Sequence, residues 1–277
     1  MTYWRRAPGR FWPTSMAAKL AAPRARVLVT RPAGQADALC AALEAAGCSA
    51  HHQPLLELQP LPELSPQAHR YVLGLDRYRH IIFISANAVK FGMAWIQAHW
   101  PQLPAGPQWY AVGDGTARAL RSYGVEVFTP GAAMHSEGLL ALPQLAAVTA
   151  QRVLLVKGEG GRGALRQTLQ ARGAGVDELA CYRRCRPLLS PGELAARLRQ
   201  WQVNVIMISS AEGFANLQAL LGPTETTELK SAVLIVPSPR VARAASAAGF
   251  EHVVTAVNAS DAAMVQALQE RLQARGE

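Results

Sequence analysis

The chain repeats itself at a spacing of about 125 residues, and this repeat restricts the possible fold more than any other feature. Each repeated unit has a short β-branched run, a Gly, Ser or Pro break, apolar residues at helical spacing, and a glycine before the next strand. The paired units begin at Arg26 and Arg152, at Ile81 and Val205, and at Tyr110 and Leu234. Strands that alternate with helices need crossover connections, which predict parallel sheets covered on both faces. We therefore expect an α/β protein with two similar domains of four or five strands each.

The repeat leaves open how the six units divide between the two domains. A single cut near residue 148 would give two consecutive domains. Alternatively, the first unit joins the last two, and the middle three form an inserted domain. Two extended stretches rich in proline or arginine, 54–66 and 181–191, lie where an interleaved chain would cross between its domains. These stretches favour the interleaved arrangement.

Length and composition exclude several classes of protein. The 277 residues are 50% hydrophobic, which is enough for two real cores. No uninterrupted apolar run approaches the roughly 18 residues that a membrane helix needs, so we expect no membrane association. The net charge is +9, but six basic residues and no acid lie within the first 26, which leaves the body of the chain at only +3. A nucleic-acid binder usually spreads its basic residues over a folded face, so no nucleic-acid partner is expected.

The N-terminal leader and the cysteines indicate the compartment. Residues 1–23 have no apolar core of a secretory signal, and we expect them to be a disordered leader. The four cysteines are too few for a disulfide scaffold, and no CxxC or His-x-His motif accompanies them. We interpret them as reduced thiols of a cytoplasmic protein that has no metal site.

Small, hydroxylated or basic residues follow the predicted strands, where open parallel sheets bind their ligands. Loops of this kind expose backbone N–H groups at helix N-termini and bind carboxylates or phosphates. Helix capping alone would explain about half of them. The whole set predicts a polyanionic ligand between two domains. Its members are Thr30, Arg31, Ser85, Asn87, Gly113, Thr116, Lys157, Gly158, Gly160, Arg162, Ser209, Ser210, Ser238 and Arg240.

Residues 158–163 match the GxGxxG pattern of dinucleotide-binding proteins, and two acids follow about twenty residues later. This match supports an alternative function as an NAD(P)-dependent oxidoreductase. The corresponding loop of the other repeat has lost the pattern. Moreover, Asp177 and Glu178 are expected within a strand, whereas a ribose-binding acid should end one.

Catalytic candidates are few. Tyr182 lies beside Arg183 and Arg184 in the stretch where an interleaved chain would cross, and a phenol there could donate a proton or a hydrogen bond. The competing interpretation is that Tyr182 only packs its ring. His52 and His80 are expected at the surface.

Six ordered segments resemble the uroporphyrinogen-III synthase family. The resemblance runs from about residue 25 to the C-terminus. It is carried by Thr30-Arg31-Pro32, Phe83-Ile84-Ser85-Ala86-Asn87-Ala88-Val89, Val112-Gly113-Asp114-Gly115-Thr116-Ala117, Ser136-Glu137-Gly138-Leu139-Leu140, Lys157-Gly158-Glu159-Gly160-Gly161-Arg162, and Tyr182-Arg183-Arg184 with Pro187.

The resemblance implies two flavodoxin-like domains that are interleaved in sequence and joined by a two-stranded β connector. Domain 1 would then comprise residues 24–56 and 190–277, and domain 2, which is inserted, residues 68–180. The connector strands would comprise residues 57–67 and 181–189. The substrate would bind in the cleft between the domains.

The resemblance also implies a lyase of tetrapyrrole biosynthesis that needs no metal or organic cofactor. Such enzymes close linear hydroxymethylbilane to uroporphyrinogen III, with inversion of the D ring and loss of water. Tyr182 matches the tyrosine proposed to assist departure of the hydroxyl. Ser85, Thr116 and Ser209 match hydroxyl positions that line the cleft, and Ser136 belongs to a matching motif. We expect a monomer that receives its substrate from hydroxymethylbilane synthase.

Three positions depart from the family pattern. Ile84 replaces the usual threonine, and Lys157 replaces an arginine, which keeps the charge but loses the planar fork. The loop at Ser238 and Arg240 is one residue longer than usual.

A third functional class, a non-catalytic two-domain receptor for a small anion, is compatible with the repeat and a cleft alone.

Overall fold

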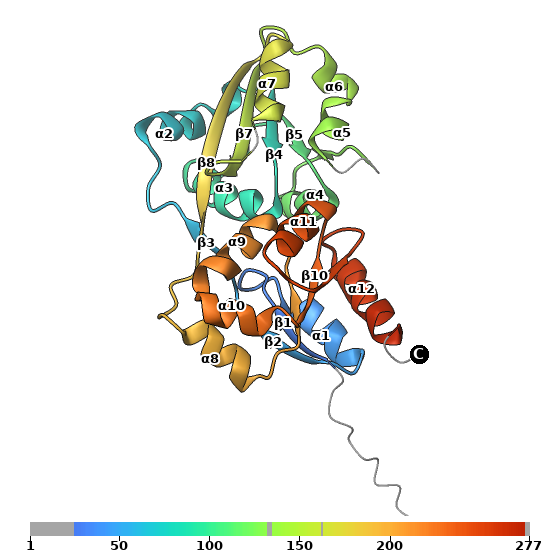
Figure 1. Cartoon of the computed structure of the whole chain (residues 1–277). Helices are drawn as coiled ribbons and strands as arrows, with labels where there is room; N and C mark the ends of the chain where they lie inside the picture. Colours follow the sequence, from blue (N-terminus) through green and yellow to red (C-terminus); the bar gives the residue numbers. More distant parts are fainter. Residues whose placement is uncertain (1–24, 132–134, 162, 275–277) are drawn as a thin grey trace, which may run out of the picture.

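The computed structural model describes residues 25–131, 135–161 and 163–274, and these form two lobes (Figure 1). The leader 1–23 and the candidate ligand Arg162 lie outside the described residues. Both lobes are α/β structures built on parallel strands, as the repeat predicts. The lower lobe of Figure 1 holds both the first and the last strands of the chain.

The lower lobe has a five-stranded parallel sheet in the order β2-β1-β9-β10-β11, the order found in flavodoxin-like folds. Its strands are β1 (Arg26–Val29), β2 (Ser49–His52), β9 (Val205–Met207), β10 (Val233–Val236) and β11 (His252–Thr255). Its helices are α1 (Asp37–Ala45), α8 (Glu193–Gln200), α9 (Ala211–Leu220), α10 (Pro223–Leu229), α11 (Pro239–Ala247) and α12 (Asp261–Gln273).

Alternating apolar residues place helices on both faces of this sheet. Val27 and Val29 of β1 point into a core shared with α1 and α12. Leu28, between them, belongs to the opposite core, which α8, α9 and α11 complete. A strand that is buried on both faces explains why the repeat contains continuous apolar runs rather than a polar–apolar alternation.

The upper lobe has a six-stranded sheet in the order β3-β8-β7-β4-β5-β6. Its strands are β3 (Glu57–Pro60), β4 (His80–Phe83), β5 (Gln108–Ala111), β6 (Val127–Phe128), β7 (Arg152–Gly158) and β8 (Gly175–Cys185). Its helices are α2 (Pro66–Leu73), α3 (Ala86–His99), α4 (Asp114–Arg121), α5 (Ser136–Leu140), α6 (Pro143–Ala146) and α7 (Ala164–Ala171), with a short 3-10 turn at Leu75–Arg77. Ile81 and Phe83 pack toward α2, α3 and α4, whereas Ile82 packs toward α5, α6 and α7.

Strand pairing shows which units share a sheet. Val27 of β1 lies beside Val205 of β9, and both strands run in parallel. The middle units of the chain form the other sheet, where Ile81 of β4 lies beside Leu154 of β7. A single cut near residue 148 would therefore divide both sheets.

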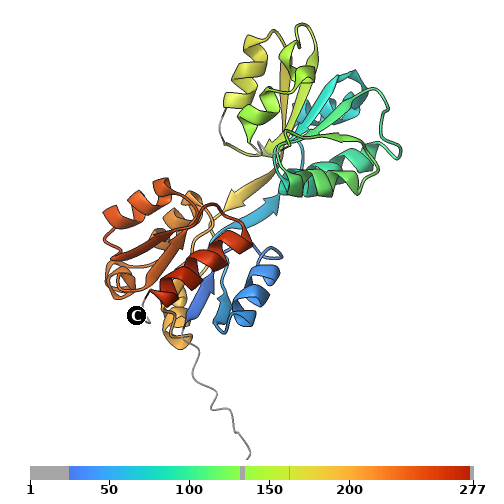
Figure 2. The same ribbon diagram turned by 90° about the vertical axis from the view of Figure 1, so that its right-hand side faces the viewer.

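The two lobes are joined where β3 and the end of β8 run side by side (Figure 2). The first part of β8 is parallel to β7, and its last part is antiparallel to β3. Tyr182 belongs to both ladders, because it is the partner of Gly158 in one and of Pro60 in the other. Strand structure in the expected connector is limited to Glu57–Pro60 and to the end of β8 at Cys185.

Among the described residues, no helix combines the length and the apolar character that crossing a membrane requires. All four cysteines are free thiols.

Candidate active site

The candidate site begins at the carboxyl ends of the strands where the strand order reverses, because ligands of open parallel sheets bind there. In the lower lobe this point lies between β1 and β9. Thr30 follows β1, and Ser209 follows β9. In the upper lobe it lies between β4 and β7, and Ser85 and Gly158 mark the strand ends. Residues predicted from the sequence therefore occupy both reversal points.

Tyr182 is held tightly at the reversal point of the upper lobe. It is only 3% exposed, and its ring stacks on Phe91 with 5.3 Å between the ring centroids. On the other side, a Cβ added to Gly158 would lie 2.6 Å from Tyr182 Cζ, so the ring fills the space that this glycine leaves open. The Tyr182 hydroxyl lies 3.3 Å from Ser85 Oγ. The residue thus packs its ring, as the simpler interpretation expects, and also presents a fixed hydroxyl.

Several predicted hydroxyl groups have structural partners. Ser85 Oγ accepts a hydrogen bond from Ala88 N at 3.0 Å, and Ser210 Oγ accepts one from Gly213 N at 3.0 Å. These two serines are the N-caps of α3 and α9, a position where serine is preferred because its hydroxyl accepts a hydrogen bond from the first turn. Thr30 is 4% exposed, and its hydroxyl donates to Met207 O at 2.6 Å, which ties the loop after β1 to β9.

The remaining predicted residues differ in accessibility. Thr116 is 6% exposed within α4 and belongs to the buried core rather than to an open surface. Gly113 and Ser238 are the N-caps of α4 and α11, and Ser136 begins α5. Gly160 adopts a φ of +69° in the exposed loop after β7, a conformation that favours glycine.

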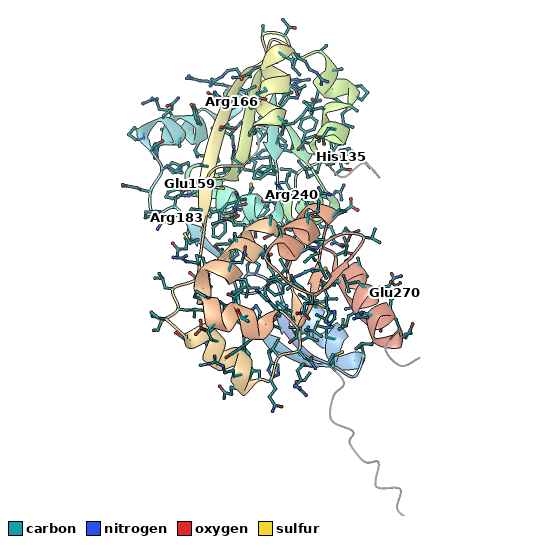
Figure 3. The ribbon with its side chains drawn as sticks, in the orientation of Figure 1. His135, Glu159, Arg166, Arg183, Arg240 and Glu270 are labelled. Carbon is teal, nitrogen blue, oxygen red and sulfur yellow. The ribbon has the colours of Figure 1, made fainter. Side chains whose placement is uncertain are left out.

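Two of the predicted anion-binding cations are already paired. Arg31 Nη1 lies 2.5 Å from Asp261 Oδ1, and its other terminal nitrogen donates to Ala259 O. Lys157 Nζ lies 3.0 Å from Glu178 Oε1, and its side chain is 12% exposed. Both cations therefore have an acidic partner already, and their role in binding the substrate stays a prediction. Arg240 is exposed in the first turn of α11 and is labelled in Figure 3.

The acids that follow the glycine-rich loop do not support a dinucleotide site. Asp177 and Glu178 both lie inside β8 rather than at a strand end. Asp177 accepts hydrogen bonds from Tyr78 and Arg152, and Glu178 pairs with Lys157. Neither carboxylate is placed to bind a ribose hydroxyl.

His80 corrects the expectation of surface histidines. It is 2% exposed within β4, where Nδ1 lies 3.0 Å from Tyr110 Oη and Nε2 lies 2.5 Å from Gln151 Oε1. Burial lowers the pKa of His80. Burial also raises the pKa of Tyr110 to about 12. His80 is the first residue of β4, whereas the candidate site lies at the carboxyl end of the strand. This hydrogen-bond network therefore supports the fold rather than the site.

The lobes touch through polar side chains on either side of the connector. Gln35 Nε2 donates to Asn87 Oδ1 at 2.9 Å and links the loop after β1 to the start of α3. Arg184 Nε lies 3.0 Å from Glu212 Oε2 of α9. The backbone oxygen of Glu159, labelled in Figure 3 near the crossing strand, accepts a long 3.4 Å hydrogen bond from Arg184.

A cavity of about 290 Å³ lies between the lobes beside the first of these contacts. Residues from both lobes and from β3 line it: Pro32, Ala33, Gln35, Pro54, Glu57, Leu58, Asn87, Lys90 and Phe91. Asn87 was predicted from the sequence, but Gln35, Lys90 and Phe91 were not. The spacing of residues 87, 90 and 91 places these three on one face of a helix. The sequence contains this spacing, but the same spacing is common in surface helices that bind nothing, so it does not identify a site.

Among the described residues, no group of three or more His, Cys, Asp or Glu side chains could hold a metal ion. The chemistry that these residues can supply is hydrogen bonding, weak acid catalysis by a phenol, and binding of anionic groups.

Comparisons with known proteins agree on one family. The family model described as uroporphyrinogen-III synthase matches residues 37–266. The chain is 33% identical to uroporphyrinogen-III synthase of Escherichia coli K12 over 249 residues, which cover 88% of this chain and 99% of the relative. It is 34% identical to the Salmonella typhimurium enzyme over 246 residues, again 88% of this chain and 99% of the relative.

Solved structures agree on the fold. A mutant uroporphyrinogen-III synthase of Thermus thermophilus aligns with a TM-score of 0.55 at 19% identity, over 90% of this chain and 99% of that one. The Helicobacter pylori enzyme aligns with a TM-score of 0.55 at 14% identity, over 80% and 92% of the two chains. The family match over most of the sequence and the identity to full-length relatives establish that this chain belongs to the uroporphyrinogen-III synthase family.

Proposed function

We propose that this chain is an active uroporphyrinogen-III synthase, which closes linear hydroxymethylbilane to uroporphyrinogen III with inversion of the D ring. The reaction releases water, so the enzyme is a cyclising lyase, and the proposal includes no metal or organic cofactor. The observation that carries the proposal is the placement of Tyr182. Its hydroxyl is fixed by Ser85 at a reversal point of the upper sheet, on the strand that crosses between the lobes.

In this proposal Tyr182 assists departure of the substrate hydroxyl. The phenol donates a hydrogen bond to that oxygen and then its proton, so that the oxygen leaves as water. Ser85 Oγ holds the phenol in position through the hydrogen bond between the two hydroxyl groups. A weak acid such as a phenol is sufficient, because the electron-rich pyrrole stabilises the cation that remains. The harder task is conformational, because the inverted ring must reach the other end of the chain before direct head-to-tail closure occurs.

The carboxylates of the substrate need donors on both lobes. Backbone N–H groups at the starts of α4, α9 and α11 supply donors without a charged side chain. We propose that Gly113, Ser209 and Ser238 contribute at these loops, that Gly160 contributes in the loop after β7, and that the exposed Arg240 adds a positive charge. Arg31 and Lys157 contribute only where a substrate carboxylate competes with their present acid partners.

The domain boundaries are part of the same proposal. We assign residues 24–56 and 190–277 to domain 1, residues 68–180 to domain 2, and residues 57–67 and 181–189 to the connector. The proposal also includes a monomer in the cytoplasm that receives its substrate from hydroxymethylbilane synthase.

The product isomer tests the proposed function directly. Purified full-length chain is supplied with hydroxymethylbilane by a coupled deaminase, and the products are oxidised and separated by chromatography. We expect the type III isomer in excess over the type I isomer that forms spontaneously. Type I product alone, at every concentration of the chain, would reject the proposal and favour an anion receptor. A fluorescence titration with NADH tests the dinucleotide alternative, for which we expect no binding.

A further inference from the structure

The cavity between the lobes is lined by a cation, Lys90, whose charge is not neutralised by an acid. Lys90 is exposed on α3 and takes part in none of the ion pairs found among the described residues. Its ammonium group lies 5.4 Å from the centroid of the Phe91 ring, within the range of a cation–π contact. This contrasts with Arg31 and Lys157, which are both neutralised.

The cavity also presents an aromatic surface close to Tyr182. Phe91 lines the cavity and stacks on the Tyr182 ring, so it separates the cavity from the proposed acid by the thickness of one ring. Asn87 lies one helical turn before Lys90 and Phe91. Its Oδ1 accepts the hydrogen bond from Gln35, which leaves its Nδ2 group as a donor in the same cavity.

A ligand that satisfies all three groups is a flat aromatic ring with a carboxylate substituent. The carboxylate would bind the ammonium and the amide N–H groups, and the ring would contact Phe91. Glu57 lines the cavity as well, and its Oε2 accepts a hydrogen bond from Gln59 Nε2 at 3.3 Å. Its negative charge repels a second carboxylate on that side, so the cavity favours one orientation of the ring.

We propose that this cavity is a subsite for one carboxylated pyrrole ring of the linear substrate, in which Lys90 binds the carboxylate and Phe91 contacts the pyrrole. The inference rests on the proposed function and adds a specificity-determining residue to it. Binding there places a pyrrole one aromatic ring away from Tyr182. Gln35 of the lower lobe and Asn87 of the upper lobe both line the cavity and are hydrogen-bonded to each other, so both lobes would contact this ring.

The test compares three lysine variants of the full-length chain. Lys90→Met removes the charge and keeps an unbranched side chain that is one atom shorter, and Lys90→Arg keeps the charge. Lys230→Met is the matched control, because Lys230 lies before β10, at the amino ends of the strands, whereas the candidate site lies at their carboxyl ends. Circular dichroism first verifies that each variant is folded. The measurements are KM for hydroxymethylbilane in the coupled assay and the affinity for uroporphyrin III from its fluorescence.

We expect KM to rise about tenfold in Lys90→Met, because a charge-assisted contact is lost at an accessible site. Lys90→Arg and Lys230→Met should remain within twofold of the parent chain. The inference is overturned if Lys90→Met also remains within twofold, or if Lys90→Arg loses as much as Lys90→Met. The porphyrin affinity should fall in Lys90→Met alone. A parent chain that makes only type I product would instead reject the proposed function, and the porphyrin titration would still report on the cavity.

Discussion

Tyr182 and Gly158 are partners on adjacent strands, and the tyrosine ring occupies the volume that any side chain at Gly158 would need. A register shift between Lys157 and Gly158 accompanies this contact. The end of β7 is therefore shaped around the ring of the proposed acid. This contact links the packing of the upper lobe to its proposed chemistry. Substitutions at the two residues should therefore change the free energy of unfolding, the turnover, or both.

Replacement of Tyr182 by phenylalanine separates the hydroxyl from the ring. The ring still stacks on Phe91, so the free energy of unfolding should change by less than about 1 kcal/mol. Turnover should fall about 100-fold, because general-acid assistance is typically worth that much. The affinity for uroporphyrin III should remain within twofold. Tyr123→Phe is the matched control, and turnover equal to that of the parent chain would remove Tyr182 from the chemistry.

Gly158→Ala should disturb the same site through packing. The new Cβ would lie 2.6 Å from Tyr182 Cζ, so the ring or the strand must move. We expect a loss of about 1–3 kcal/mol in the free energy of unfolding from urea denaturation, together with lower turnover. Gly106→Ala provides the control, since nothing lies within 4 Å of a Cβ at that position. Equal stability of the two variants would contradict the close packing of Tyr182.

Buried His80 should make the stability of the chain depend on pH. Burial lowers the pKa of His80 from its ordinary value of 6.5, so the unfolded chain binds a proton more readily than the folded one. This contribution to stability is complete above about pH 6.5, and it is lost as the pH falls toward the lowered folded pKa. The urea midpoint should therefore decrease below neutral pH.

His80→Gln should flatten this dependence in addition to any uniform loss of stability. His99→Gln, on the same lobe, should keep the slope of the parent chain, because His99 is only half-buried and bonds to the Trp95 carbonyl. A His80→Gln variant with an unaltered slope between about pH 7.5 and 5.5 would show that other groups produce the effect.

Cys181 should be the least reactive thiol of the native chain. Burial raises its pKa to about 12, and its Sγ lies 3.2 Å from Lys157 O. A thiol reagent that requires the thiolate should label it only after unfolding. Cys181→Ser should therefore leave the fast phase of thiol labelling at about pH 8 unchanged and remove one equivalent from the total in denaturant. A smaller fast phase in this variant would show that the strand opens in the native state.

The parallel sheets could be predicted from the sequence because strand pairing follows the repeat. The runs at Val205 and Ile81 each form a central strand that is buried on both faces, as their continuous apolar character indicates. The position of Tyr182 on the crossing strand was also predictable, since the extended arginine-rich stretch marks that strand. Asn87 was predicted for a different reason, because it follows a strand; it contacts Gln35 of the other lobe, and its role in binding stays a prediction.

Long-range partners could not be predicted in this way. Arg31 is of a residue type that commonly binds anions. Its partner Asp261, however, lies near the other end of the chain, and no local sequence pattern connects the two. His80 was expected to precede a strand and therefore to lie at the surface, whereas it belongs to β4, and Tyr110 and Gln151 are its hydrogen-bond partners in the fold. Lys90 could not be predicted either, because exposed lysines on helices are common. Only the position of the other lobe shows that this one lines a cavity.

The double membership of Tyr182 in two ladders has a mechanical consequence. The same residue is registered against Gly158 of the upper sheet and against Pro60 of the strand that returns from the lower lobe. A rotation of one lobe against the other would bend the backbone beside this residue, whereas Phe91, Gly158 and Ser85 keep its ring with the upper lobe. Opening or closing of the lobes would therefore move the lower lobe relative to a proton donor that stays in place.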